Sequence, residues 1–157
     1  MAAEKKTKEP SEVMKKWKPY ELEKPLEETV LYDKVEPHIA RVTLNRPEKH
    51  NAFYLLDMGF EFCRKLRMGA DDDDVKVIIL RGLGPSFSTG DDLNRAPYEA
   101  VGGRPGMKLP QSKRLWGFHR LYEALKEDLL FNPKTVVAQV QGWVLGYGNG
   151  IVEMCDL

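Results

Sequence analysis

The sequence predicts a single α/β domain built around a parallel sheet. Two apolar runs rich in β-branched residues, Val75–Leu80 and Thr135–Val140, have the composition of buried strands. Amphipathic helical segments precede both runs, and a glycine-centred turn follows each one. Strands that alternate with helices favour parallel pairing through crossover connections. A chain of 157 residues has room for one hydrophobic core but is short for two.

The first elements predicted along the chain are a hairpin and a helix. The strand candidates Val30–Tyr32 and Ile39–Leu44 flank the turn residues Glu36-Pro37. Asn51 can cap the helix that follows, which should end near Gly69. The apolar residues of this helix recur at spacings of three and four: Leu56, Phe60, Cys63 and Leu66.

The later elements repeat this layout. The near-continuous apolarity of Val75–Leu80 predicts a strand buried on both faces. Ser112 is a candidate cap for a second helix that ends before Asn132-Pro133. The apolar face of that helix comprises Leu115, Phe118, Leu121, Leu125 and Leu129. The strand Thr135–Val140 then leads to a third helix, expected to begin at about Gly148.

Composition excludes several classes of protein. Lysine plus arginine balances aspartate plus glutamate at 24 each, so the global charge does not favour a nucleic acid or an anionic membrane as partner. No apolar run is long enough to cross a bilayer and the N-terminus is too charged for a secretory signal, so we expect a cytoplasmic protein. Residues 1–28 form a charged leader, predicted to be flexible, and 29–157 the domain.

The cysteines and histidines do not indicate a metal centre. Cys63 and Cys155 each lie in an apolar stretch, which favours buried thiols over a disulfide. His38, His50 and His119 are scattered and lack zinc-ligand spacing. We therefore expect neither a metal nor a redox cofactor.

Two glycine-centred turns carry the strongest functional signal. They are Phe87-Ser-Thr-Gly-Asp-Asp-Leu93 and Gly142-Trp-Val-Leu-Gly-Tyr-Gly-Asn-Gly150, each a short distance after a strand candidate. Two such turns can direct backbone N–H groups at one oxygen atom. That arrangement suits an oxyanion hole, where fixed donors stabilise the negative charge that develops on a carbonyl oxygen.

Three motifs together resemble the enoyl-CoA hydratase/isomerase (crotonase) family. They are Thr43-Leu-Asn-Arg-Pro-Glu-Lys-His-Asn-Ala52, the Phe-Ser-x-Gly-x-Asp-Leu turn, and Gln141-Gly-Trp-Val-Leu-Gly-x-Gly followed by Met154-Cys-Asp-Leu157. The resemblance covers roughly Thr29 to Leu157. It implies a crotonase-like spiral of ββα units, cut short here before the C-terminal helices, and assembly into a homotrimer or hexamer if the fold is complete.

The resemblance also implies a substrate and the residues that bind it. The substrate would be an acyl-CoA thioester, with coenzyme A entering as part of the substrate and not as a cofactor. The oxyanion donors would be the N–H groups of Asp91 and Tyr147. The coenzyme A and acyl contacts would come from the first two motifs and the second turn: Lys49, His50, Ala52, Thr89, Gly90, Asp92, Leu93 and Gly146. The loop Asn94–Gln111 would line the acyl pocket.

The sequence departs from the family pattern at the proton-transfer group. Gly150 occupies the position of the catalytic glutamate of family hydratases, and Tyr147 replaces the middle glycine of a triplet. Glu153, about one helical turn further on, is an alternative carboxylate that is more readily explained as facing a neighbouring element or subunit. Asp91 is either a carboxylate that reaches the acyl group or a turn residue. For Asp92 we favour turn formation, with its side chain bonded to the backbone of a following helix.

These observations leave two functions open. One is an acyl-CoA enzyme that catalyses isomerisation, hydrolysis, or hydration with a relocated acid. The other is a non-catalytic, incomplete domain that retains the fold and associates with relatives. A dinucleotide-binding domain is disfavoured because Gly146-x-Gly-x-Gly150 lacks the required G-x-G-x-x-G spacing.

Overall fold

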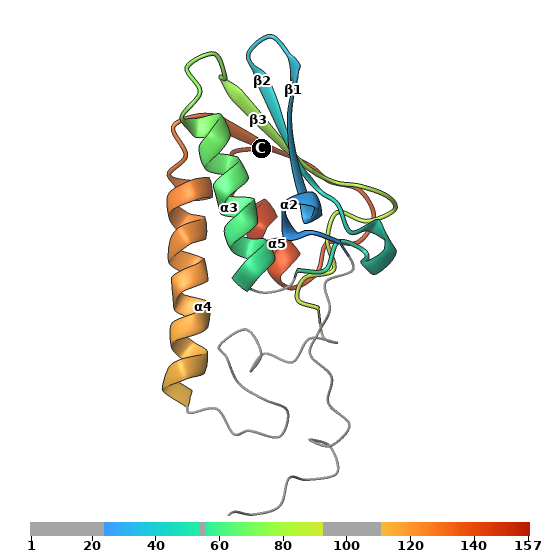
Figure 1. The fold of residues 1–157 in the computed structure, drawn as a ribbon, viewed down its shortest axis with the longest axis vertical. Helices are drawn as coiled ribbons and strands as arrows, with labels where there is room; N and C mark the ends of the chain where they lie inside the picture. The colour runs from blue at the N-terminus through green and yellow to red at the C-terminus, as the bar shows by residue number, and fades with distance from the viewer. Residues whose placement is uncertain (1–23, 54–55, 93–110) are drawn as a thin grey trace, which may run out of the picture.

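The computed structural model describes residues 24–53, 56–92 and 111–157, and Figure 1 shows how their elements are arranged. The elements in chain order are α2 (Leu26–Thr29), β1 (Val30–Glu36), β2 (Ile39–Leu44), the 3₁₀-helix η1 (Pro47–Lys49), α3 (Leu56–Ala70), β3 (Val77–Gly82), α4 (Gln111–Leu125), the π-helix η3 (Lys126–Leu130), β4 (Thr135–Gln139) and α5 (Tyr147–Glu153).

The sheet has the mixed topology that the sequence predicts. Its strand order is β1-β2-β3-β4. β1 and β2 form the antiparallel hairpin, in which Val30 lies opposite Leu44. β2 pairs with β3 and β3 with β4 in parallel, so the helical connections carry the chain from one strand to the next. The last residues extend this pattern, because the N–H of Ala138 on β4 donates to the carbonyl of Leu157.

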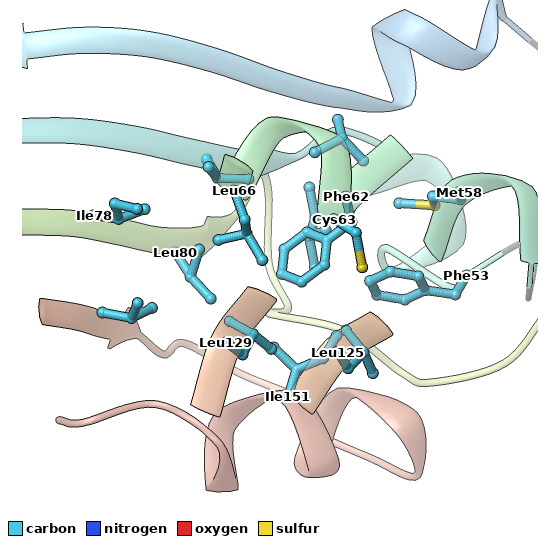
Figure 2. Close-up of a cluster of buried hydrophobic side chains, with 14 of the residues drawn as sticks. Phe53, Met58, Phe62, Cys63, Leu66, Ile78, Leu80, Leu125, Leu129 and Ile151 are labelled. Atoms are coloured by element: carbon cyan, nitrogen blue, oxygen red, sulfur yellow. The ribbon is translucent and has the colours of Figure 1, made fainter. Parts of the chain in front are cut away.

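The core lies between the sheet and the helices. Figure 1 shows α3 and α4 running side by side next to the sheet, and α3 contacts β1, β2 and α4. Figure 2 shows side chains from β3, α3, the α4–η3 segment and α5 converging on one apolar cluster. Its labelled members are all buried: Phe53, Met58, Phe62, Cys63, Leu66, Ile78, Leu80, Leu125, Leu129 and Ile151. Both cysteines are free thiols.

Burial corrects two sequence predictions. Along β3 full burial alternates with partial burial, so the expected strand buried on both faces is wrong, and a single face meets the core. On α3 the core face includes Met58 and Phe62, whereas Phe60 is 45% exposed. Met58, Phe62 and Leu66 follow an i, i+4, i+8 row, and Phe60 lies off that row.

Both predicted helix caps are also wrong. Ser112 lies inside α4, which begins at Gln111. Asn51 lies ahead of α3, and its side chain is bonded to the loops around it, as described below. At the N-terminal end, α2 spans the predicted boundary between leader and domain, and Leu26 packs against the core.

Candidate functional site

A buried asparagine holds together the segments that carry the first two motifs. The Nδ2 of Asn51 donates to the carbonyls of Leu83 (2.9 Å) and Ser86 (2.8 Å). Its Oδ1 accepts the N–H of Arg46 at 2.8 Å. Asn51 adopts a left-handed backbone with φ of 55°, which asparagine tolerates better than most residues. With both ends of its amide engaged, Asn51 fixes the loop after β2 against the loop after β3.

A buried ion pair makes the second connection between these loops. Arg46 Nη2 lies 3.0 Å from Asp92 Oδ2, and both side chains are almost completely inaccessible to solvent. The Nη1 of Arg46 also donates to the carbonyl of Ala52. Asp92 therefore neutralises a buried guanidinium. Its expected bond to a following helix falls on residues outside the described part of the chain.

The two glycine turns are joined directly by backbone hydrogen bonds. Phe87 N–H donates to the carbonyl of Gln141 at 2.7 Å, and Ser88 N–H to that of Trp143 at 3.1 Å. Leu145 N–H returns a bond to the carbonyl of Ser88 at 3.0 Å. This ladder holds in parallel two segments that are more than 50 residues apart in the sequence.

Glycine is required where the turns touch. Gly90 has φ of 86°, and a Cβ at this position would lie 2.8 Å from the carbonyl oxygen of Leu145 and 3.0 Å from the nitrogen of Tyr147. A Cβ on Gly148 would lie 2.8 Å from the carbonyl oxygen of Ser88. The absence of side chains at both positions brings the two backbones into contact.

The N–H of Asp91 lies on the side of the first turn that faces away from Phe53. Phe53 pairs with this turn through its own N–H, which donates to Gly90 at 2.7 Å, and through its carbonyl, which accepts the N–H of Asp92 at 2.9 Å. Successive N–H groups of an extended segment point to opposite sides, so the N–H of Asp91 faces away from Phe53. Among the described residues it has no acceptor.

The N–H of Tyr147 is the second donor without an acceptor. The first four N–H groups of an α-helix lack partners within the helix. In α5 the three N–H groups after that of Tyr147 have acceptors in the preceding turn. Gly148 donates to the carbonyl of Leu145, and Asn149 and Gly150 donate to the carbonyl of Gly146. In the part of the chain that the structure describes, nothing accepts the N–H of Tyr147, the first residue of α5.

Two polar side-chain atoms beside these donors also lack hydrogen bonds. Asp91 Oδ1 and the Tyr147 hydroxyl are both buried, and neither has a partner within the described ranges. Burial raises the pKa of the Asp91 carboxyl and that of the Tyr147 phenol above their ordinary values. The Tyr147 ring packs edge-on against Phe53, with centroids 5.0 Å apart, and against Tyr122 at 6.3 Å.

The two other candidate positions on α5 lack this setting. Gly150 has no side chain, and a Cβ there would meet no atom within 4 Å. Glu153 is exposed and its Oε1 accepts the side-chain amide of Asn149 at 2.5 Å. The carboxylate of Glu153 is therefore held along the solvent side of its own helix.

The positions expected to contact coenzyme A lie on the loop after β2 and on the first turn. Lys49 and His50 are exposed at the end of η1, and Ala52 is buried. His50 Nδ1 lies 3.0 Å from Ser86 Oγ, and Thr89 N–H donates to the His50 carbonyl at 3.0 Å. Gly146, with φ of 51°, precedes α5. Leu93 and nearly all of the loop Asn94–Gln111 fall outside the described residues.

Sequence reasoning missed the residues that hold the site together. Arg46, Asn51 and Ser88 are buried, and Ser88 Oγ donates to the Asn51 carbonyl at 2.9 Å while it accepts the N–H of Gly90 at 3.1 Å. Each of these three polar residues lies inside one of the sequence motifs. A motif does not show which residue far along the chain its side chain will bind. Across the described ranges there is no metal-ligand cluster and no helix able to cross a membrane.

Comparison with known proteins matches this chain to a protein family. The model of the enoyl-CoA hydratase/isomerase family matches residues 34–157. The 1,2-epoxyphenylacetyl-CoA isomerase of Escherichia coli is 31% identical over 114 residues, which cover 73% of this chain and 40% of the isomerase.

Solved structures share the same arrangement. A probable enoyl-CoA hydratase from Mycobacterium smegmatis superposes with a TM-score of 0.70 at 32% identity, over 82% of this chain and 47% of that one. A monofunctional enoyl-CoA isomerase from M. smegmatis gives a TM-score of 0.61 at 26% identity, over 82% and 48%. This chain thus spans less than half the length of the relatives that it matches.

Proposed function

Because the chain belongs to the enoyl-CoA hydratase/isomerase family, we propose that it binds an acyl-CoA thioester and polarises the thioester carbonyl through the N–H groups of Asp91 and Tyr147. The supporting observations are the backbone ladder between the two turns and the contact of Gly90, the residue before Asp91, with the Tyr147 nitrogen. Neither donor has a protein acceptor among the described residues. Fixed donors of this kind stabilise the charge that moves onto the oxygen as the α-carbon loses a proton or the carbonyl is attacked.

The coenzyme A portion would lie along the two segments that Asn51 and Arg46 join. Lys49 and His50 offer exposed cationic or polar groups for phosphate, and Ala52, Thr89, Gly90, Leu93 and Gly146 would contact the ligand through backbone or short side chains. Asp92 would act indirectly, because its carboxylate is engaged by Arg46. No further cofactor is proposed. A cytoplasmic location and assembly into trimers or hexamers stay predictions.

Binding of a thioester and of its thioether analogue tests this function. We expect butanoyl-CoA at one hundred times its dissociation constant to stabilise the chain by about 2.7 kcal/mol in thermal unfolding. The S-butyl thioether of coenzyme A has no carbonyl oxygen, so it should bind about 10-fold more weakly through the loss of two hydrogen bonds. Equal affinities, or no binding of either ligand, would contradict the proposal.

A non-catalytic acyl-CoA-binding chain is the second candidate, and one observation favours it. Gly150 provides no carboxylate at the position of the family glutamate, and the space beside it is open. Under this alternative the thioester would bind with the same preference over the thioether, but no chemical change would follow. Turnover or exchange of substrate hydrogens, measured on the same ligand, separates the two candidates.

A further inference from the structure

Among the described residues, the carboxyl group of Asp91 has an unusual environment for an acidic side chain. Its Oδ1 is buried and makes no hydrogen bond to the described chain. The Asp91 residue as a whole is only partly buried, whereas the neighbouring Asp92 is buried and paired with Arg46 at 3.0 Å. Buried polar atoms are nearly always satisfied, so an unsatisfied one requires an explanation. A carboxylate that contacts a ligand provides such an explanation.

The position of Asp91 specifies where that ligand would be. The N–H of Asp91 is one of the two donors proposed for the thioester oxygen, and its carboxyl belongs to the same residue. In a thioester the α-carbon is bonded to the carbonyl carbon. A carbonyl oxygen held by the backbone of Asp91 therefore places the α-hydrogens within the surroundings of the Asp91 side chain.

The described residues offer no equivalent carboxylate on α5. Gly150 has no side chain, and Glu153 is exposed and bonded to Asn149. The ionisable groups that act on the Tyr147 phenol are Cys63, Tyr122 and Asp91 itself, and the first two are neutral at pH 7 in their ordinary forms. The pKa of Asp91 is shifted by burial alone. Asp91 is thus an acidic side chain on one of the two donor residues whose buried oxygen is not engaged by the described chain.

We propose that the Asp91 carboxylate is the base that removes a proton from the α-carbon of the bound thioester, an inference that rests on the proposed function. The C–H electron pair becomes the C=C bond of an enolate, and the carbonyl π pair moves onto the oxygen held by the N–H groups of Asp91 and Tyr147. The proton now resides on the Asp91 carboxyl. Nothing else is consumed.

The Asp91 carboxyl alone is enough for both proton transfers of one class of reaction. With a thioester unsaturated between its β- and γ-carbons, the protonated Asp91 can return the proton to the γ-carbon while the double bond moves to the α,β position. Atoms and electrons balance without water. Hydration would require a further group to activate water, and α5 supplies none at Gly150. The site therefore fits 3-enoyl-CoA isomerisation.

The electrostatic environment agrees with this role. Burial raises the pKa of Asp91 toward the range in which a general base works best near neutral pH. The exchange rate should rise with pH through one ionisation that lies above the ordinary aspartate value, because the carboxylate is the active form.

Hydrogen exchange measures this step directly. Butanoyl-CoA, which cannot isomerise, is incubated with the 157-residue chain in D2O, and deuterium at the α-carbon is followed by mass spectrometry. Asp91→Asn keeps the backbone N–H and should lower the exchange rate at least 100-fold, while the dissociation constant for butanoyl-CoA stays within about 3-fold. Asp33→Asn is the matched control. Asp33 lies on β1, where it pairs with Arg41 of β2 away from the site, so this variant should leave both quantities unchanged.

The outcomes separate this inference from the proposed function. Exchange by the unaltered chain that persists within 3-fold in Asp91→Asn would overturn the role of Asp91 and leave thioester binding intact. Thioester binding without any exchange would overturn it too. Failure of the unaltered chain to bind butanoyl-CoA would remove the proposed function itself. Equal melting temperatures of the two variants confirm that lost exchange does not reflect unfolding.

Discussion

At the scale of the residue, Gly90 of the first turn and Gly150 of the second have opposite backbone roles. Gly90 contacts the second turn and has a φ of 86°, which other residues adopt only with strain. Gly150 is the fourth residue of α5, has an ordinary helical backbone and faces open space. The backbone conformation at position 90 requires glycine. The helical backbone at position 150 does not, and the space around it could hold a side chain.

Alanine at these two positions should change stability in opposite directions. Gly90→Ala should destabilise the chain by at least about 1–2 kcal/mol, because the left-handed backbone is strained and the Cβ meets backbone atoms. Gly150→Ala should stabilise it by about 0.5–1 kcal/mol, as alanine does for glycine within a helix. Chemical denaturation of both variants checks this. A similar change for both would contradict the assigned backbone roles.

Single residues also mark where sequence reasoning reached its limit. The resemblance suggested Asp91 and Tyr147 as the two donors, and the turns that carry them are joined by backbone hydrogen bonds. The resemblance could not show that Asp92 pairs with Arg46, since an ion pair between residues 46 positions apart depends on the whole fold. Asn51 was interpreted as a helix cap because asparagine is common there, but its amide is satisfied by loops.

At the scale of the element, periodicity predicted strands better than helix faces. β2 has the predicted bounds, Ile39–Leu44, because its apolar residues leave few alternatives. β1 continues to Glu36, beyond the predicted Tyr32, because hairpin pairing with β2 extends through its polar residues. On α3 the predicted face was right at Cys63 and Leu66, which are buried, and wrong at Phe60, which is exposed. Met58 and Phe62 extend the buried face on the other side of Leu66, where the spacing of the large apolar residues gave no clear preference.

The junction of α3 with η3 depends on one ion pair that the sequence did not reveal. Asp128 lies in the π-helix η3, is 7% exposed, and accepts Arg67 Nε from α3 at 2.7 Å. Arg67 itself is largely exposed. The loss of stability on removing one partner therefore depends on whether that partner is Arg67 or Asp128.

Removing Arg67 alone should lower the stability of the chain more than removing both Arg67 and the charge of Asp128. Arg67→Ala should destabilise the chain by about 1–3 kcal/mol, because it leaves a buried carboxylate without its cation. Arg67→Ala combined with Asp128→Asn should recover part of that loss, since the stranded charge is gone. Thermal unfolding of the two variants measures the difference. A double variant less stable than Arg67→Ala would contradict this account.

At the scale of the whole molecule, the candidate site is made by two strand-to-helix units that meet. β3 delivers the first turn and β4 the second, and parallel pairing of these strands brings both turns to the same end of the sheet. The alternation of strands and helices in the sequence was sufficient to predict this layout. The chain matches less than half of its relatives' length, so the activity of the whole fold is a proposal here.

The donor role of the Tyr147 backbone is the central claim, and proline can test it. Tyr147 is the first residue of α5, where proline is readily accepted and its missing N–H breaks no bond within the helix. Tyr147→Ala removes the same ring but keeps the N–H, so it is the matched control. The difference between the two variants therefore isolates one hydrogen-bond donor.

The rate of α-hydrogen exchange in butanoyl-CoA, compared between Tyr147→Pro and Tyr147→Ala, is the most direct measurement. We expect the proline variant to be at least about 100-fold slower, the effect of losing one oxyanion donor of about 3 kcal/mol. Equal melting temperatures would establish that both variants are folded. Equal exchange rates in the two folded variants would contradict the claim that the Tyr147 N–H holds the thioester oxygen.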